Sequence, residues 1–299
     1  MAKSQSGKMS KQDWWGYAFI SPFYILFAVF GLYPLLFSFV LSFTDWKGRG
    51  PLNFIGWANY ALMLKDNVFW QSVQNGVIIF LIYVPIMTFL ALVLAVILNS
   101  PRIRGYKFFR LIIFLPYITN MVAAGFVFQS LLNQEVGLFN LALEAIGLPA
   151  VPWLNSIWGA RVSLGILVTW AWLGYNMVIM LAGLQTIDRE LTEAALIDGA
   201  TPVQSFFYIT VPLMRPVILF SVILSTIGSF GLFTELVSLF PQSQGMGPLN
   251  STVTPLLVIF RQTFNNFRFG YASALGYSFF ALIFVVTVLQ FRFFDRSEE

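Results

Sequence analysis

The chain has 299 residues, of which 58% are hydrophobic and 10% charged, and its formal net charge is +4. Soluble domains carry roughly 25% charged residues, so this composition excludes a soluble fold and makes the lipid bilayer the expected solvent. The chain has no cysteine or histidine. Their absence excludes disulfides and thiol chemistry, and it removes the commonest general base and metal ligand. The positive charge comes mainly from loops and calls for no nucleic acid partner.

The first 70 residues divide into a tail, a span and a loop. Residues 1–15 form a basic tail that we expect in the cytoplasm. The apolar run Gly16–Phe43 is too long for the ~7–15-residue core of a signal peptide. It is therefore expected to stay as the first span, kinked at Pro22 or Pro34. Residues 16–70 thus hold the first transmembrane helix and a polar external loop.

Five later apolar runs are each long enough to cross about 30 Å of hydrocarbon at about 1.5 Å per residue. They are Val73–Leu98, Leu111–Leu132, Val162–Leu184, Pro212–Phe240 and Ala272–Phe294. The sequence therefore predicts an all-α, polytopic membrane protein with six transmembrane helices. Residues 133–160 and 241–271 contain Gly, Pro, Asn and Trp, which is typical of structured outer loops.

The basic residues orient these spans. With the N-terminus inside, the inner segments hold Lys3, Lys8, Lys11, Arg102, Arg104, Lys107, Arg110, Arg189, Arg215, Arg292 and Arg296. The outer segments hold Lys47, Arg49, Lys65, Arg161, Arg261 and Arg268. This excess obeys the positive-inside rule. Both termini, including the tail at residues 295–299, are expected in the cytoplasm.

A polar stretch between the fourth and fifth spans predicts two short helices joined at a glycine. Asp188 can cap the first helix, and Glu190 is favourable in its first turn. Gly199 can end that helix in the left-handed conformation without steric cost. Thr201–Gln204 then has the pattern of a capping box, with proline at the first helical position. The orientation derived from charge places this stretch in the cytoplasm.

The same stretch resembles the EAA motif of the permeases of ABC importers. Glu193-Ala194-Ala195, Asp198-Gly199, Ile209 and Pro212 stand at the spacing of that motif. In the family this loop is the coupling helix, which docks in a cleft of a cytoplasmic ATPase. The resemblance implies a type I importer permease fold with its permease domain at residues 71–294 and coupling helices at 188–209. It also implies ATPase-coupling roles for Glu193, Ala194, Ala195, Asp198 and Gly199.

Further segments resemble the carbohydrate-importing branch of that family. Phe54–Tyr60 is similar to a stretch that follows the first span, Gly245–Pro248 to a G-G-P element, and Phe269–Ala274 to the opening of the last span. Asp188 departs from the pattern, because the family usually has proline there. Since aspartate can still cap the helix, we expect altered local rigidity and no loss of function.

The resemblance implies a set of partners in a prokaryotic cytoplasmic (inner) membrane. They are a second homologous permease, two ATPase subunits, an extracytoplasmic sugar-binding protein and membrane lipid. ATP and Mg²⁺ are expected on the ATPase, because the only Gly-Lys pair, Gly7-Lys8, lacks the rest of a Walker loop. No catalytic motif or metal motif is recognisable. We therefore expect that the chain is not an enzyme and binds no cofactor of its own.

Candidate substrate-path residues lie in the fourth and fifth spans. Trp172, Tyr175 and Asn176 share one helical face, and Ser225 and Ser229 share another. Aromatic faces and hydroxyl or amide groups suit a sugar, and the resemblance places the sugar site of maltose-type relatives in these two spans. The alternative is helix packing, where small and polar residues are common. The acidic candidate is Glu235, either in the path or hydrated at the membrane interface.

Three alternative functions remain at this point. Permeases for glycerol-3-phosphate or glycerophosphodiesters look alike and would share the coupling loop. An integral membrane enzyme is disfavoured by the lack of a catalytic constellation. A channel is disfavoured by the coupling motif. The leading prediction is a permease subunit that carries an oligosaccharide or a related polyol.

Overall fold

The computed structural model describes residues 11–100 and 104–295, and four basic residues assigned to the inner side, Lys3, Lys8, Arg102 and Arg296, lie outside them. Helices form the regular structure of the described residues, apart from one isolated antiparallel bridge between Thr44 and Phe54. The chain divides into two compact units. One comprises residues 1–65 and 262–277, and the other residues 66–261 and 278–299.

The smaller unit contains the first span. Its helices are α1 (Lys11–Phe27), a π-helix (Ala28–Leu32), α2 (Tyr33–Leu41) and α3 (Ala58–Leu64). The unit also holds a second π-helix (Arg261–Asn265) from its second residue onward, and the start of α15 (Phe269–Asp295). Pro22 lies inside α1 without a break. The interruption of regular α-helix comes instead just before Pro34, whose ring has no N–H to donate to the preceding turn.

A buried asparagine closes the loop after α2. The Asn59 amide donates to the carbonyls of Ser42 and Thr44 at 2.9 and 2.8 Å, and the Tyr60 hydroxyl donates to Ser42 Oγ at 2.9 Å. A Cβ on Gly270 would lie 2.0 Å from the Thr44 carbonyl oxygen, so this position accommodates only glycine. These contacts explain structurally why Asn59 and Tyr60 stand in the segment Phe54–Tyr60, and why glycine stands at position 270 in the segment Phe269–Ala274.

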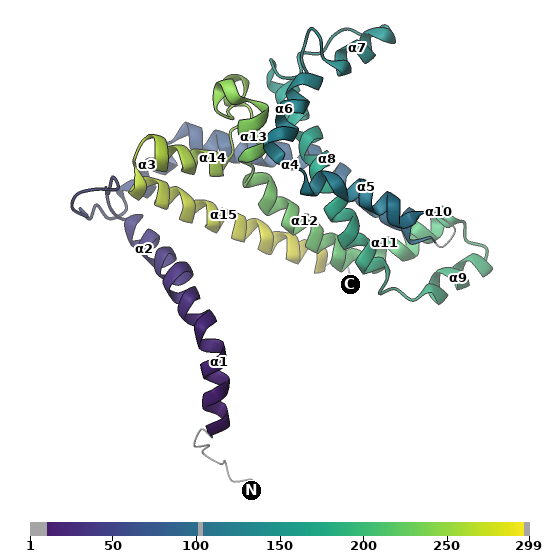
Figure 1. Cartoon of the computed structure of the whole chain (residues 1–299), viewed down its shortest axis with the longest axis horizontal. Coiled ribbons are helices and arrows are strands. Elements are labelled where there is room, and N and C mark those ends of the chain that lie inside the picture. Colours follow the sequence, from purple (N-terminus) through teal and green to yellow (C-terminus); the bar gives the residue numbers. More distant parts are fainter. Residues whose placement is uncertain (1–10, 101–103, 296–299) are drawn as a thin grey trace. The chain divides into compact units, whose positions relative to one another are not determined.

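The larger unit is an assembly of long and broken helices. In chain order they are α4 (Asn67–Asn99), α5 (Tyr106–Ile118), α6 (Met121–Leu131), α7 (Leu138–Ala145), α8 (Ile157–Leu184), α9 (Arg189–Ile197), α10 (Pro202–Ser205), a π-helix (Phe206–Thr210), α11 (Val211–Leu213), α12 (Arg215–Phe230), α13 (Thr234–Leu239), two 3₁₀ turns (Pro241–Ser243 and Pro248–Asn250) and α14 (Pro255–Phe260) (Figure 1). The second half of α15 completes this unit.

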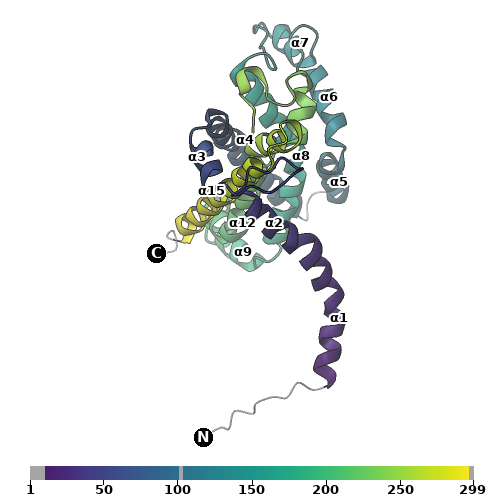
Figure 2. The ribbon, with the colours of Figure 1, turned by 90° about the vertical axis from the view of Figure 1, so that its left-hand side faces the viewer.

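The core of the larger unit forms where α4 packs against α8. Ala91 and Ala95 of α4 meet Met177 and Met180 of α8, together with Met214, and all five side chains are fully buried. Small residues on one helix and flexible thioethers on the other allow this close approach. α8 lies between α4 and α5 (Figure 2). This position makes α8 the central helix of the unit.

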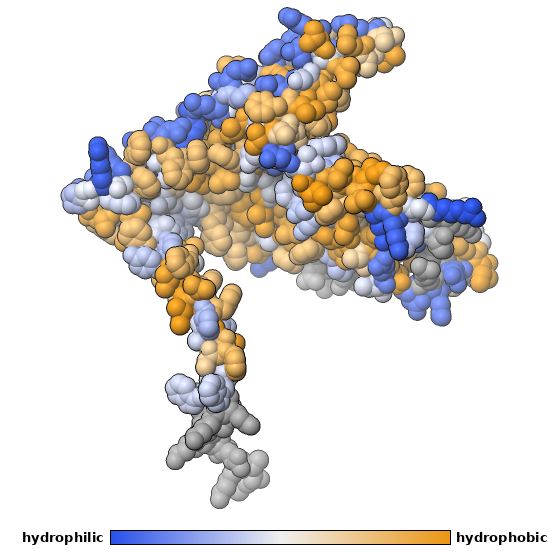
Figure 3. All heavy atoms as spheres, in the orientation of Figure 1, coloured by the Kyte–Doolittle hydropathy of each residue, from blue (hydrophilic) through white to orange (hydrophobic). Residues whose placement is uncertain are grey.

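The prediction of six spans agrees with the helices when bent pairs are counted as one. Four helices are long and apolar enough by themselves: Trp14–Leu41, Asn67–Asn99, Ile157–Leu184 and Phe269–Phe293. Two pairs pass the same test together, Tyr106–Ile118 with Met121–Leu131 and Pro202–Leu213 with Arg215–Phe230. Hydrophobic residues cover the flank of α5, and hydrophilic residues lie near α10 (Figure 3). The all-α polytopic prediction is confirmed.

The predicted third span is not one straight helix. α5 and α6 meet at an angle of 95°. Asn120 sits at the corner in an extended conformation, and its side chain accepts hydrogen bonds from the amides of Val122 and Ala123 at 2.9 and 3.2 Å. A residue that caps the second helix in this way stops the first from continuing.

The predicted fifth span, Pro212–Phe240, is wrong as a continuous helix. It bends by 69° between α11 and α12, where Pro216 in the first turn of α12 cannot donate to the preceding turn. α12 ends at Phe230, and Phe233 has φ −140° and ψ −60°, outside the helical region. Glu235 therefore lies on the separate short helix α13.

Candidate functional site

The polar loop at residues 188–209 has the local structure predicted for it. The Asp188 carboxylate accepts the Glu190 amide at 3.0 Å and caps α9. At the other end Gly199 has φ +92°, its amide donates to the Leu196 carbonyl, and the next amide donates to the Ala195 carbonyl at 2.9 Å. These two bonds form a Schellman motif. The turn needs glycine for its backbone conformation alone, because an added Cβ would meet no atom within 4 Å.

The second helix of the loop starts with a complete capping box. Thr201 Oγ1 accepts the Gln204 amide at 3.3 Å, and Gln204 Oε1 accepts the Thr201 amide at 2.8 Å. These reciprocal bonds satisfy donors that the first turn would otherwise leave free. The two helices are therefore joined through a short turn held by backbone and side-chain hydrogen bonds.

The solvent-exposed surface of α9 combines acidic residues with exposed apolar residues. Glu193, Ala194 and Asp198 are exposed, and Ala195 is half-buried. Ile197 is 86% exposed and Leu196 47%. Two adjacent apolar side chains are thus presented to solvent on this polar loop. These two apolar residues were not predicted from the sequence, although they lie inside the motif.

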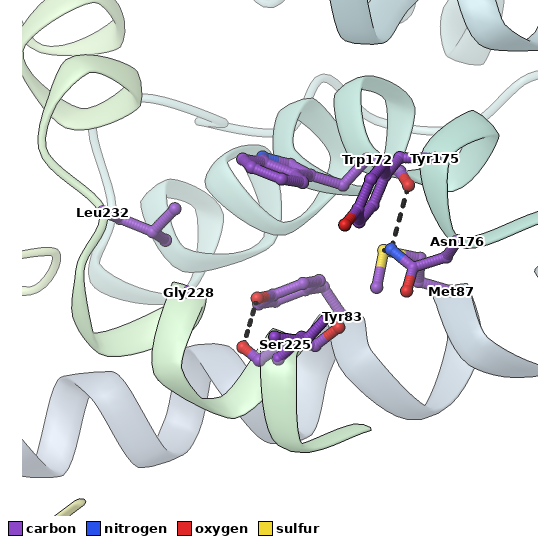
Figure 4. A pocket seen from close by; sticks show the side chains of 9 residues that line it. Tyr83, Met87, Trp172, Tyr175, Asn176, Ser225, Gly228 and Leu232 are labelled. Atoms are coloured by element: carbon purple, nitrogen blue, oxygen red, sulfur yellow. Dashed lines mark hydrogen bonds between the residues drawn. The ribbon is translucent and has the colours of Figure 1, made fainter. Parts of the chain in front are cut away.

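Most of the predicted substrate-path residues meet in one cavity of about 160 Å³ (Figure 4). Trp172, Tyr175 and Asn176 of α8 line one wall, and Ser225 of α12 lines another. The remaining lining residues include Tyr83 and Met87 of α4, which the sequence analysis did not single out. None of the lining residues carries a charge.

Tyr83 and Met87 stand four residues apart on α4, so they share a face. The Tyr83 hydroxyl donates to the Ser225 carbonyl at 3.0 Å, which ties α4 to α12. The sequence signal for this residue was a hydroxyl within an otherwise apolar stretch of the span, shared with Thr88. α4 is apolar almost all round, so its sequence does not show which face meets α8.

An aromatic cluster covers one side of the cavity. Tyr117 stacks on Tyr175 with ring centroids 4.8 Å apart, and Trp172 meets both rings edge-on. Tyr175 extends its hydroxyl towards the interior of the cavity (Figure 4). The Trp172 indole N–H is buried and has no hydrogen-bond partner in the described part of the chain. The cluster offers flat faces and one free donor.

The other predicted residues have different surroundings. Asn176 accepts from Ser221 and donates to the Trp172 carbonyl at 3.0 Å, so its amide already joins α8 to α12. Ser229 is buried and donates to the Thr226 carbonyl at 2.8 Å, outside the cavity lining. Glu235 is 8% exposed and also lies outside the lining. Among the described residues, no group of three or more acidic side chains could hold a metal ion.

The family of the chain follows from comparison with known proteins. Residues 67–298 match the family described as binding-protein-dependent transport system inner membrane component. The chain belongs to this family. The match begins at the first residue of α4 and covers most of the chain, so the permease resemblance seen in the sequence is confirmed.

Individual permeases of this family resemble the chain along most of its length. The lactose transport system permease protein of Rhizobium radiobacter is 43% identical over 280 residues, or 92% of each chain. The arabinooligosaccharides transport system permease protein of Halalkalibacterium halodurans is 33% identical over 92% of this chain and 85% of its own. A bacterial ABC transporter involved in the import of the acidic polysaccharide alginate has a chain that matches with a TM-score of 0.79, 22% identity and 96% coverage of both. That similarity confirms the type I permease fold.

Proposed function

We propose that this protein is the membrane permease of an ATP-driven importer that carries a neutral oligosaccharide or related polyol. The observation that carries the proposal is the α9–α10 loop, in which the family motif forms a rigid knob with exposed Leu196 and Ile197. A separate ATPase subunit docks on this knob and binds ATP and Mg²⁺. A second homologous permease, a second ATPase and an extracytoplasmic binding protein complete the assembly in the cytoplasmic membrane, with both termini of this chain inside.

The uncharged central cavity supports the substrate class. Glycerol-3-phosphate and glycerophosphodiesters carry anionic phosphate, which proteins bind with Arg or Lys, and the lining contains neither. Aromatic faces and hydroxyls suit a neutral saccharide, and similar permeases are named for lactose and arabinooligosaccharides. The cavity of about 160 Å³ is below the roughly 300 Å³ of typical ligand pockets. A second permease would supply the missing walls.

The chain path links the knob to the cavity. α10 runs through the π-helix Phe206–Thr210 and α11 to the bend at Met214, and α12 continues from there to Ser225. Met214 is fully buried in the core between α4 and α8, so the bend is anchored. Movement of the knob on the ATPase would therefore move the cavity wall formed by α12. Such differential contacts in two states are what ATP-driven alternating access requires.

Affinity purification from native membranes followed by reconstitution tests the proposal. The tagged full chain is expected to bring down an ATPase and a second permease. Proteoliposomes with the complex and its binding protein should take up at least one of lactose, arabinotriose and maltotriose only when ATP is present. Uptake without ATP would indicate a channel, and chemical alteration of the sugar would indicate a membrane enzyme. Neither result is compatible with the proposal.

Replacing Tyr175 with alanine is expected to weaken the apparent affinity for the transported sugar about ten- to a hundredfold. The change removes a stacking face and a hydroxyl from the cavity, and an unpaired buried polar contact costs about 1–3 kcal/mol. Uptake kinetics and the melting temperature in detergent should be measured together. Tyr175→Phe keeps the ring and isolates the hydroxyl. Unchanged affinity with a lower melting temperature would show that Tyr175 only packs helices.

Replacing Glu193 with lysine is expected to reduce capture of the ATPase subunit at least severalfold. Glu193 is exposed on α9, within the motif that the resemblance assigns to docking. Glu190→Lys is the matched control, because Glu190 lies closer to the positive end of the helix dipole and should feel any dipole effect more strongly. Pull-down of the ATPase by each variant at equal chain yield measures the difference. Equal capture by Glu193→Lys and the wild type would argue against the assignment.

A further inference from the structure

A second cavity, of about 310 Å³, lies at the end of α6 and has polar walls. Its lining includes five carboxamides and no charged side chain: Gln129, Asn133, Gln134, Asn155 and Gln242. They come from the end of α6, two loop segments and the turn after α13, which packs beside α6 (Figure 1). The loops fall within segments that the sequence analysis assigns to the outer side. This cavity shares no lining residue with the central one.

A buried asparagine holds two walls of this cavity in place. Asn140 is 1% exposed, and its amide nitrogen donates to the carbonyls of Gln134 and Val151, each at 3.0 Å. Its oxygen accepts the Val151 amide at 3.0 Å and the Trp153 indole N–H at 2.8 Å. Four hydrogen bonds to one side chain preorganise the segments around residues 134 and 151–155. The shape of the cavity is therefore fixed by hydrogen bonds within the loops.

The carboxamides keep unused polar atoms. Asn133 Oδ1 accepts two backbone amides, at 2.9 and 3.2 Å, and its NH₂ group has no hydrogen-bond partner among the described residues. Asn155 donates to Gln134 Oε1 at 3.1 Å, and the Asn155 oxygen and the Gln134 NH₂ group are unpaired in the part of the chain that the structure describes. The Gln129 nitrogen donates to the Leu239 carbonyl at 3.4 Å, and its oxygen has no bond within the described residues. The cavity thus offers both donors and acceptors.

We propose that this amide-lined cavity is an outer binding site for a neutral saccharide, through which the substrate passes before it reaches the central cavity. Sugar hydroxyls both donate and accept hydrogen bonds, so they pair with donors and acceptors held side by side. The lining holds no Arg or Lys that would pair with an anion, so its amides favour a neutral partner. The volume of about 310 Å³ falls at the small end of ligand pockets. This inference rests on the proposed carbohydrate import.

A paired substitution tests the site with little cost to folding. Gln134→Met and Asn155→Leu together replace two mutually bonded amides with apolar groups of similar shape, which leaves no unpaired partner. The matched control is Gln262→Met with Asn266→Leu, because Asn266 donates to Gln262 in the same way at 3.0 Å, outside the cavity. The full complex in proteoliposomes is assayed with diazirine derivatives of lactose, arabinotriose and maltotriose, for uptake and for crosslinked peptides.

In the wild type, crosslinks are expected around residues 129–134 and 152–155 as well as in the central cavity. The cavity variant should lose the outer crosslinks and raise the apparent KM about tenfold with an unchanged maximal rate, while the control variant matches the wild type. An unchanged KM with crosslinks in the central cavity alone would overturn the proposal. Loss of binding-protein capture with crosslinks intact would overturn it in favour of a protein-docking role. If the wild type imports none of these sugars, the proposed function fails, and this site fails with it.

Discussion

Replacing Gly199 with valine is expected to abolish sugar uptake while the protein still inserts and accumulates. Gly199 has φ +92°, a conformation that costs a residue with a Cβ about 1–2 kcal/mol and a β-branched one more. No atom lies within 4 Å of the added Cβ, so the strain falls on the turn and leaves the core intact. The Schellman motif would open, and the α9 surface would no longer be held beside α10. Uptake by proteoliposomes at matched protein content measures the effect.

The control for this substitution is Gly105→Val. Gly105 also has a positive φ, +79°, and open space around its Cβ, but it lies in a loop without the motif. Equal losses of uptake in the two variants would mean that backbone strain at either turn suffices to block uptake. Normal uptake by Gly199→Val at wild-type levels would remove the turn from the coupling mechanism.

Replacing Gly174 with valine is expected to prevent assembly of the folded core. A Cβ at Gly174 would lie 2.1 Å from the Ile113 carbonyl oxygen and 2.7 Å from Phe114 Cα, both backbone atoms of α5 that cannot rotate away. α5 and α8 would have to separate, which also breaks the stack of Tyr117 on Tyr175. Overpacking a core lowers the free energy of unfolding by about 1–3 kcal/mol. A clash with backbone atoms is expected to cost at least the upper value of this range.

The melting temperature in detergent and the yield of monodisperse protein measure this loss. Gly174→Ala should give a smaller decrease of the same sign, because only one methyl group must be accommodated. Gly276→Val is the control, since Gly276 also lies in a long helix and an added Cβ there meets no atom within 4 Å. A Gly174→Val protein with the same melting temperature as the wild type would contradict the close packing of α5 on α8.

The relation between sequence and structure differs between the loop and the spans. The caps at Asp188 and Thr201 and the turn at Gly199 were predictable because each depends on hydrogen bonds between residues only two to five positions apart. The number of spans was predictable from length and hydropathy. Their breaks were missed, because the corners at Asn120 and Phe233 depend on single residues inside apolar runs.

The sites depend on contacts that no local pattern contains. Tyr83 reaches the central cavity only because α4 turns one particular face to α8, and a helix that is apolar all round does not specify that face. The amide-lined cavity gathers residues as far apart as Gln129 and Gln242. The sequence by itself determined six apolar spans and a capped polar loop, because those features follow from composition and short-range bonds, and its motif carried the resemblance to the permease family. Only the tertiary structure decided which side chains share a cavity. Packing between segments distant in the sequence sets which face a helix turns inward and which loops come into contact.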